Sequence, residues 1–82
     1  MNRIAIGRLL SFKTGSGVPA SHDAIRGWKS QEVKYLYKND IVMTVENYLH
    51  EGQFPIVKCL SKYGFVYVHL CHLRSDWAKR LA

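Results

Sequence analysis

Residues 54–70 read FPIVKCLSKYGFVYVHL, and this stretch decides the fold. Residues 54–60 and 65–70 are rich in β-branched and aromatic residues, which favour strands. Between them, residues 61–64 (SKYG) provide the glycine that a tight turn requires. The stretch therefore predicts a β-hairpin whose Lys58 faces solvent. The residues expected to face the core are Val57, Cys59, Val66, Val68 and Leu70.

Upstream of the hairpin, residues 41–45 (IVMTV) alternate in the manner of a half-buried strand. The alternation predicts that Ile41, Met43 and Val45 form its inner face. Residues 49–53 (LHEGQ) connect this strand to the next and contain a glycine, so a further hairpin is expected.

The N-terminal residues 3–13 also alternate and predict a first strand. Gly7 is expected to form a bulge that turns Arg8 outward and Leu9 inward. The following residues 14–20 (TGSGVPA) concentrate turn formers and predict an exposed loop.

Two short helical turns are expected outside the strands. Ser21 precedes a segment that ends near Trp28, and serine is a preferred residue at the N-terminus of a helix. Ser75 stands in the same relation to a final turn through Trp77 and Leu81.

The length and composition indicate a single soluble domain over residues 1–82. The chain is 48% hydrophobic and 22% charged, near globular averages. It contains neither a secretory signal nor an apolar run long enough for a membrane span, so we expect a cytoplasmic protein with Cys59 and Cys71 as free thiols. A core of this size is small, which leaves a homodimer open.

Residues 37–42 (YKNDIV) and 63–66 (YGFV) are similar to the turn-then-strand entry and the distal turn of SH3-like (Src-homology-3 type) barrels. The resemblance covers roughly residues 3–74 and implies an all-β barrel of about five strands with one or two short helical turns. Prokaryotic and phage barrels of this type, including the KOW group, often bind nucleic acid or a host protein, and the resemblance implies such a partner by analogy. The sequence departs from the peptide-binding branch, because Phe54 and Tyr67 stand near the positions where that branch has tryptophan and proline.

Positive charge dominates the chain: 12 Lys and Arg against 6 Asp and Glu give a net charge of +6 and a pI near 9.6. Such an excess favours acidic partners. Several cations alternate with aromatic residues, which suits phosphate contacts and stacking on bases. The predicted binding residues are Arg26, Trp28, Lys29, Lys34, Tyr35, Tyr37, Lys38, Lys58, Lys62 and Tyr63.

These residues predict a nucleic-acid-binding module. The alternative is a protein-interaction or inhibitor domain, of the phage accessory type, that blocks an acidic surface of a host enzyme or complex, because arginine and aromatic residues also mark protein interfaces.

Catalytic and metal chemistry have little support in the sequence. His69, Cys71 and His72 are types that bind zinc, but neighbouring residues of a strand point to opposite faces and no Cys-x-x-Cys pair is present. Because neighbouring strand residues point to opposite faces, the adjacent His72 would also point away from Cys71 and could not activate it as a nucleophile. We therefore expect no metal, no cofactor and no enzymatic activity.

Overall fold

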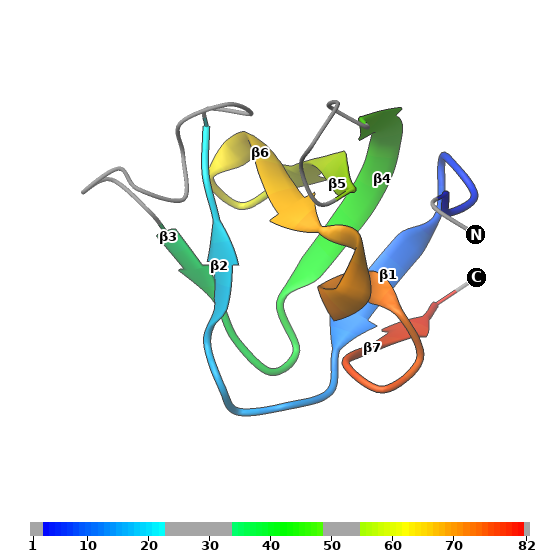
Figure 1. Ribbon diagram of the computed structural model, residues 1–82. Coiled ribbons are helices and arrows are strands. Elements are labelled where there is room, and N and C mark those ends of the chain that lie inside the picture. Colours follow the sequence, from blue (N-terminus) through cyan, green and yellow to red (C-terminus); the bar gives the residue numbers. More distant parts are fainter. Residues whose placement is uncertain (1–2, 23–33, 49–54, 82) are drawn as a thin grey trace.

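Residues 3–22, 34–48 and 55–81 are described by a computed structural model, in which they fold mainly into β-strands (Figure 1). The strands are β1 (Leu9–Phe12), β2 (Val18–Ala20), β3 (Lys34–Leu36), β4 (Ile41–Tyr48), β5 (Ile56–Ser61), β6 (Gly64–His69) and β7 (Ala78–Arg80). In the described part of the chain, five of them form an antiparallel sheet in the order β6-β5-β4-β1-β7, and β2 pairs with β3. The predicted all-β class is confirmed.

The hairpin of β5 and β6 forms as predicted. Its two strands pair antiparallel from Ile56 and His69 to Ser61 and Gly64. Gly64 has a φ of 87°, a left-handed conformation that glycine adopts without steric cost. The predicted inner face of the two strands is confirmed by burial, with exposures of 1% or less for Val57, Cys59, Val66 and Val68. Leu70, predicted to continue the second strand, is buried as expected but lies beyond β6 in a 3-10 helix.

Strand β4 has the opposite orientation to the predicted one. Val42 and Thr44 are buried, with exposures of 0% and 1%, whereas Ile41 is 51% exposed. The prediction was wrong because both alternating sets of residues 41–45 contain apolar side chains, so hydrophobicity alone does not choose the inner face. A bulge between Thr44 and Glu46 adds an irregularity that alternation also does not predict.

Thr44 holds the N-terminal segment against β4 through both its side chain and its backbone. Its hydroxyl accepts a hydrogen bond from the Arg8 amide at 3.0 Å and donates one to the Ala5 carbonyl at 2.7 Å. The Thr44 carbonyl accepts from the Gly7 amide at 2.7 Å, and the Thr44 amide donates to the Arg8 carbonyl at 3.0 Å. The first two bonds satisfy the buried hydroxyl, and the other two satisfy the backbone carbonyl and amide of the same residue.

The predicted outward Arg8 and inward Leu9 are wrong. Leu9 is 41% exposed, Leu10 is buried and Arg8 is partly buried. Gly7 has a φ of 78° and lies in a turn, so the chain reverses its course before β1 begins and the alternation of residues 3–6 does not continue into the strand.

Residues 18–20, expected in a loop, form strand β2. Val18 and Ala20 are fully buried, and Ser21 continues toward β6 through a pair of hydrogen bonds with Tyr67. In Figure 1 the pair of β2 and β3 lies on one side of the molecule and β1 and β7 lie on the other, with β4 between them. The helical turn predicted from Ser21 to Trp28 lies mostly outside the described residues.

The C-terminal region also differs from its prediction. The helical turn is a 3-10 helix, η2 (Leu70–Leu73), and residues 75–77 form a turn that leads into β7. Ser75 therefore does not begin a helix. Pairing with β1 accounts for the difference, because β7 hydrogen-bonds along the free edge of β1 and buries Ala78 against the core.

Replacing Thr44 by valine should lower the free energy of unfolding by about 1–3 kcal/mol, because the Arg8 amide and the Ala5 carbonyl would lose their hydrogen-bond partner while the volume stays similar. Urea denaturation measures the change. The matched control is Thr14→Val, whose hydroxyl makes only a 3.5 Å contact with the Ser16 carbonyl. We expect this control to stay within about 0.5 kcal/mol of the wild type. An equal effect of the two substitutions would contradict a special role for Thr44.

Candidate functional site

Three tyrosines from two parts of the chain meet beside the turn between β5 and β6. Tyr35 lies on β3 and Tyr37 follows that strand, and their side chains are 47% and 48% exposed. The Tyr63 hydroxyl donates a hydrogen bond to the Tyr35 carbonyl at 3.0 Å. This turn lies on the same side of the molecule as β2 and β3 in Figure 1 (yellow). We call Tyr35, Tyr37 and Tyr63 the tyrosine cluster.

Gly17 forms the floor beneath two of these rings. A Cβ atom at this position would lie 2.9 Å from Cδ1 of Tyr35 and 3.2 Å from Cε1 of Tyr37. Such distances are too short for an unmoved ring, so only glycine lets the rings pack this closely on the backbone. The two rings therefore have one side supported by the backbone while about half of their surface remains open to solvent.

A lysine and a carboxylate fix the turns that present the cluster. Asp40 Oδ2 accepts a hydrogen bond from the Tyr37 amide at 2.7 Å, and the Asp40 amide donates to the Tyr37 carbonyl at 2.9 Å. Lys62 Nζ lies 3.1 Å from the same Oδ2 and 5.2 Å from the centroid of the Tyr63 ring. The hydrogen bond to Asp40 raises the pKa of Lys62.

The structure brings several of the predicted binding residues into this one area. Lys34 precedes Tyr35 on β3, Lys38 follows Tyr37 in the next turn, and both lysines are exposed. Lys58 belongs elsewhere, because it lies on β5 with its Nζ 4.9 Å from the centroid of the Phe65 ring. The remaining predicted residues, Arg26, Trp28 and Lys29, lie outside the described part of the chain.

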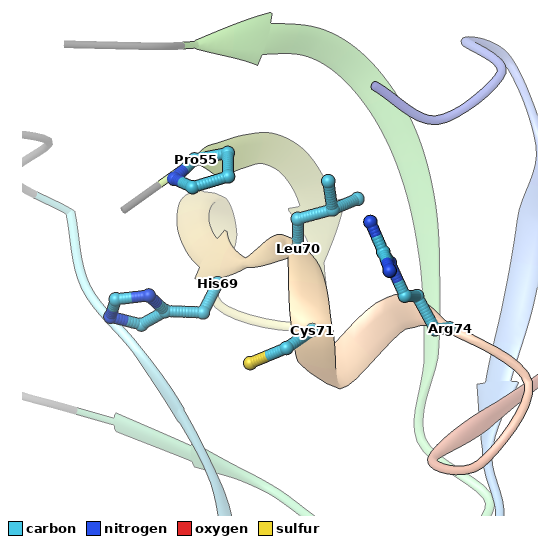
Figure 2. Close-up of a pocket in the computed structure, with 5 residues that line it drawn as sticks. All are labelled: Pro55, His69, Leu70, Cys71 and Arg74. Carbon is cyan, nitrogen blue, oxygen red and sulfur yellow. The ribbon is translucent and has the colours of Figure 1, made fainter. Parts of the chain in front are cut away.

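A shallow pocket of about 200 Å³ lies at the start of η2 (Figure 2). Pro55, His69, Leu70, Cys71 and Arg74 line it. In Figure 2 the His69 ring and the Cys71 sulfur project to one side, and the Arg74 guanidinium rises beside Leu70. The volume is below the range of about 300–1,000 Å³ that is typical of small-molecule sites.

The histidines beside this pocket pack against each other and against Trp77. The His72 ring contacts the Trp77 ring edge-on at a centroid distance of 4.7 Å. The centroids of the His69 and His72 rings lie 6.1 Å apart. Burial lowers the pKa of His72, and burial together with the nearby charge of His72 lowers the pKa of His69. Among the described residues, no three His, Cys, Asp or Glu side chains are grouped closely enough to hold a metal ion.

The two thiols have different environments. Both cysteines are free, Cys59 in the core and Cys71 at the surface. Burial raises the pKa of Cys59 to about 12, so this thiol is protonated and unreactive in the folded protein.

One feature of the surface was not predicted from the sequence. Leu60 and Phe65, on the face of the hairpin opposite to the core, are 41% and 51% exposed. The signal was present in residues 54–70, because a strand with one solvated face usually carries polar residues there and these two positions are apolar.

Comparison of the chain with protein-family models, curated proteins and solved structures found no match in any of the three. Within the described residues, no helix has the length and apolar character needed to cross a membrane.

At pH 8, a disulfide reagent that reports free thiols should label Cys71 rapidly and Cys59 only after the protein unfolds. The Cys71→Ser variant should lose the rapid phase. Rapid labelling that persists in this variant would show that the core around Cys59 opens readily.

The free energy of unfolding should decrease as the pH falls from 7.5 to 5.5. His69 and His72 have lowered pKa values in the folded state, so the unfolded chain binds protons first when the pH drops below about 6.5. The stabilising contribution of the neutral rings is complete above that pH and is lost as the pH approaches the folded pKa values. Urea denaturation at several pH values gives the free energy of unfolding, and its plot against pH should be flatter for His72→Gln than for the wild type. The control Cys71→Ser, a change in the same helix, should keep the wild-type dependence of unfolding free energy on pH. An unchanged pH dependence in His72→Gln would contradict the role of His72 in it.

Proposed function

We propose that the chain is a small nucleic-acid-binding module of the SH3-like type that contacts single-stranded nucleic acid through the tyrosine cluster and the lysines around it. The observation that carries the proposal is the pair of half-exposed rings, Tyr35 and Tyr37, held side by side on Gly17. Exposed aromatic rings on a rigid floor suit base stacking, because the rings lose little freedom when a base binds.

The charges around the cluster support the same partner. Lys34 and Lys38 are exposed next to the two rings in sequence, and the chain has a net charge of +6. Phosphates are attracted by this field without regard to base sequence. Lys62 already contacts Asp40, so we assign it mainly to positioning Tyr63, and Lys34 and Lys38 to phosphate contacts.

Stacking is expected to provide affinity without strong sequence preference. Every base has a π-face, and a stacked base contributes about 1–3 kcal/mol when measured by removing the ring. Two adjacent rings fit a strand whose successive bases are unpaired, whereas the bases of a duplex are stacked on each other. Single strands should therefore bind more tightly than duplexes of the same length.

Fluorescence anisotropy with labelled single-stranded and duplex oligonucleotides tests this proposal. Tyr35→Ser and Tyr37→Ser should each weaken single-strand binding by roughly 5- to 160-fold. Lys38→Gln should also reduce the slope of log K against log salt concentration by about 0.7, as expected for one lost phosphate contact.

Two control variants are matched to these substitutions. Ile6→Ser changes a side chain that is 48% exposed, the same fraction as Tyr37, and Lys79→Gln removes an exposed cation on β7. Both should bind like the wild type. Absence of binding at low salt, or equal losses in the tyrosine variants and Ile6→Ser, would contradict the proposal and favour the acidic protein surface as the partner.

A further inference from the structure

A continuous row of apolar side chains crosses the outer face of the five-stranded sheet. Cross-strand pairs join Leu9 to Met43, Met43 to Leu60 and Leu60 to Phe65, which places one member on each of β1, β4, β5 and β6. Leu81 extends the row past β1, because its amide donates to the Leu9 carbonyl at 2.9 Å. We call these five residues the outer apolar row.

The row is open to solvent along most of its length. Leu9 and Leu60 are 41% exposed, Leu81 is 43% exposed and Phe65 is 51% exposed. Ile41, on the same face of β4 as Met43, is 51% exposed. Single exposed apolar residues are ordinary, but a contiguous set on a sheet marks an interaction surface. Water contact along this row is therefore a free-energy cost that a partner removes.

The charges beside the row select the kind of partner. Lys58 lies opposite Glu46 in the register of β4 and β5 and has its Nζ over the Phe65 ring. Lys79 lies opposite Ser11 on β1, and Ser11 in turn lies opposite Ile41 on β4. Together with the net charge of +6, these cations oppose the approach of a second copy of the chain. They attract carboxylates that flank an apolar segment.

We propose that the outer apolar row is the docking surface for an acidic segment of another protein, one whose apolar side chains cover the row while its carboxylates meet Lys58 and Lys79. This surface is distinct from the tyrosine cluster in its residues, and its occupancy does not depend on nucleic-acid binding. The apolar contacts provide most of the affinity, and the lysines provide orientation and selectivity.

The test uses three labelled twelve-residue peptides with the same alternating leucine and phenylalanine positions and with glutamate, glutamine or lysine between them. The glutamate peptide should bind at least about ten-fold more tightly than the other two. Leu9→Gln and Leu60→Gln should each weaken it on the order of ten-fold, the loss typical of a residue central to an interface.

Variants outside the row provide the controls. Ile6→Gln, at an exposed apolar position in the N-terminal turn, and Tyr37→Ser, in the tyrosine cluster, should bind the glutamate peptide like the wild type. Circular dichroism confirms that every variant is folded. Methyl NMR of the unmodified protein adds a readout without substitution, since the signals of Leu9, Met43, Leu60 and Leu81 should shift on titration and those of the buried Val66 should shift less.

Equal affinity for the three peptides, or unchanged affinity in Leu9→Gln and Leu60→Gln, would overturn the proposal. So would sedimentation of the wild type as a dimer that Leu60→Gln dissociates, because a second copy would then occupy the row. Oligonucleotide binding measured on the same variants separates the two surfaces: Leu60→Gln should retain it and Tyr37→Ser should lose it.

Discussion

The buried hydroxyl of Thr44 determines the orientation of the central strand. A hydroxyl inside a core is costly unless both its donor and its acceptor capacities are used, and Thr44 uses both on the backbone of the N-terminal segment. This segment can supply an amide and a carbonyl because Gly7 reverses the chain just before β1. One polar contact thus sets the inner face of β4, holds residues 5–8 on its surface and aligns β1 beside it.

The exposed apolar row is a direct consequence of this orientation. With Thr44 and Val42 inside, the alternation of a strand places Met43 and Ile41 outside. Met43 then completes a line between Leu9 on β1 and Leu60 on β5. Had β4 taken the predicted orientation, with Ile41, Met43 and Val45 inside, Met43 would be in the core and the line would be interrupted at the middle strand. The interaction that stabilises the fold therefore also creates the outer surface.

The sequence predicted the elements whose signals are local and missed those that depend on distant partners. The hairpin of β5 and β6 combines β-prone residues with a glycine turn, so its strands, its turn and its inner face were all predicted correctly. Strands β2 and β7 are three residues long, and they become strands only because β3 and β1 offer them hydrogen bonds. The orientation of β4 required knowledge that Ala5 and Arg8 would lie against Thr44, which no spacing within residues 41–45 contains.

The candidate site was predictable to a similar extent. The tyrosines and lysines near residue 37 could be selected because cations and rings alternate there, and Tyr63 was selected from a separate turn by its residue type. Their convergence depends on the Tyr63 hydroxyl reaching the Tyr35 carbonyl and on Lys62 reaching Asp40, contacts between segments that are distant in sequence. Lys58 shared the composition of the group, yet the alternation of β5 places it over Phe65 instead.

The contrast between Lys58 and Lys62 shows how this small domain distributes its positive charge. Lys62 is paired with Asp40, a carboxylate that also fixes a turn, so its positive charge is largely compensated within the protein. Lys58 lies over an exposed ring, where its charge remains available to a partner while its methylene groups extend the apolar surface. A partner that covered Phe65 would remove water from around this ammonium group, and an unpaired ammonium in an apolar contact is unfavourable. A carboxylate in the partner removes that penalty, which is why an acidic flank belongs to the most stable complex on this face.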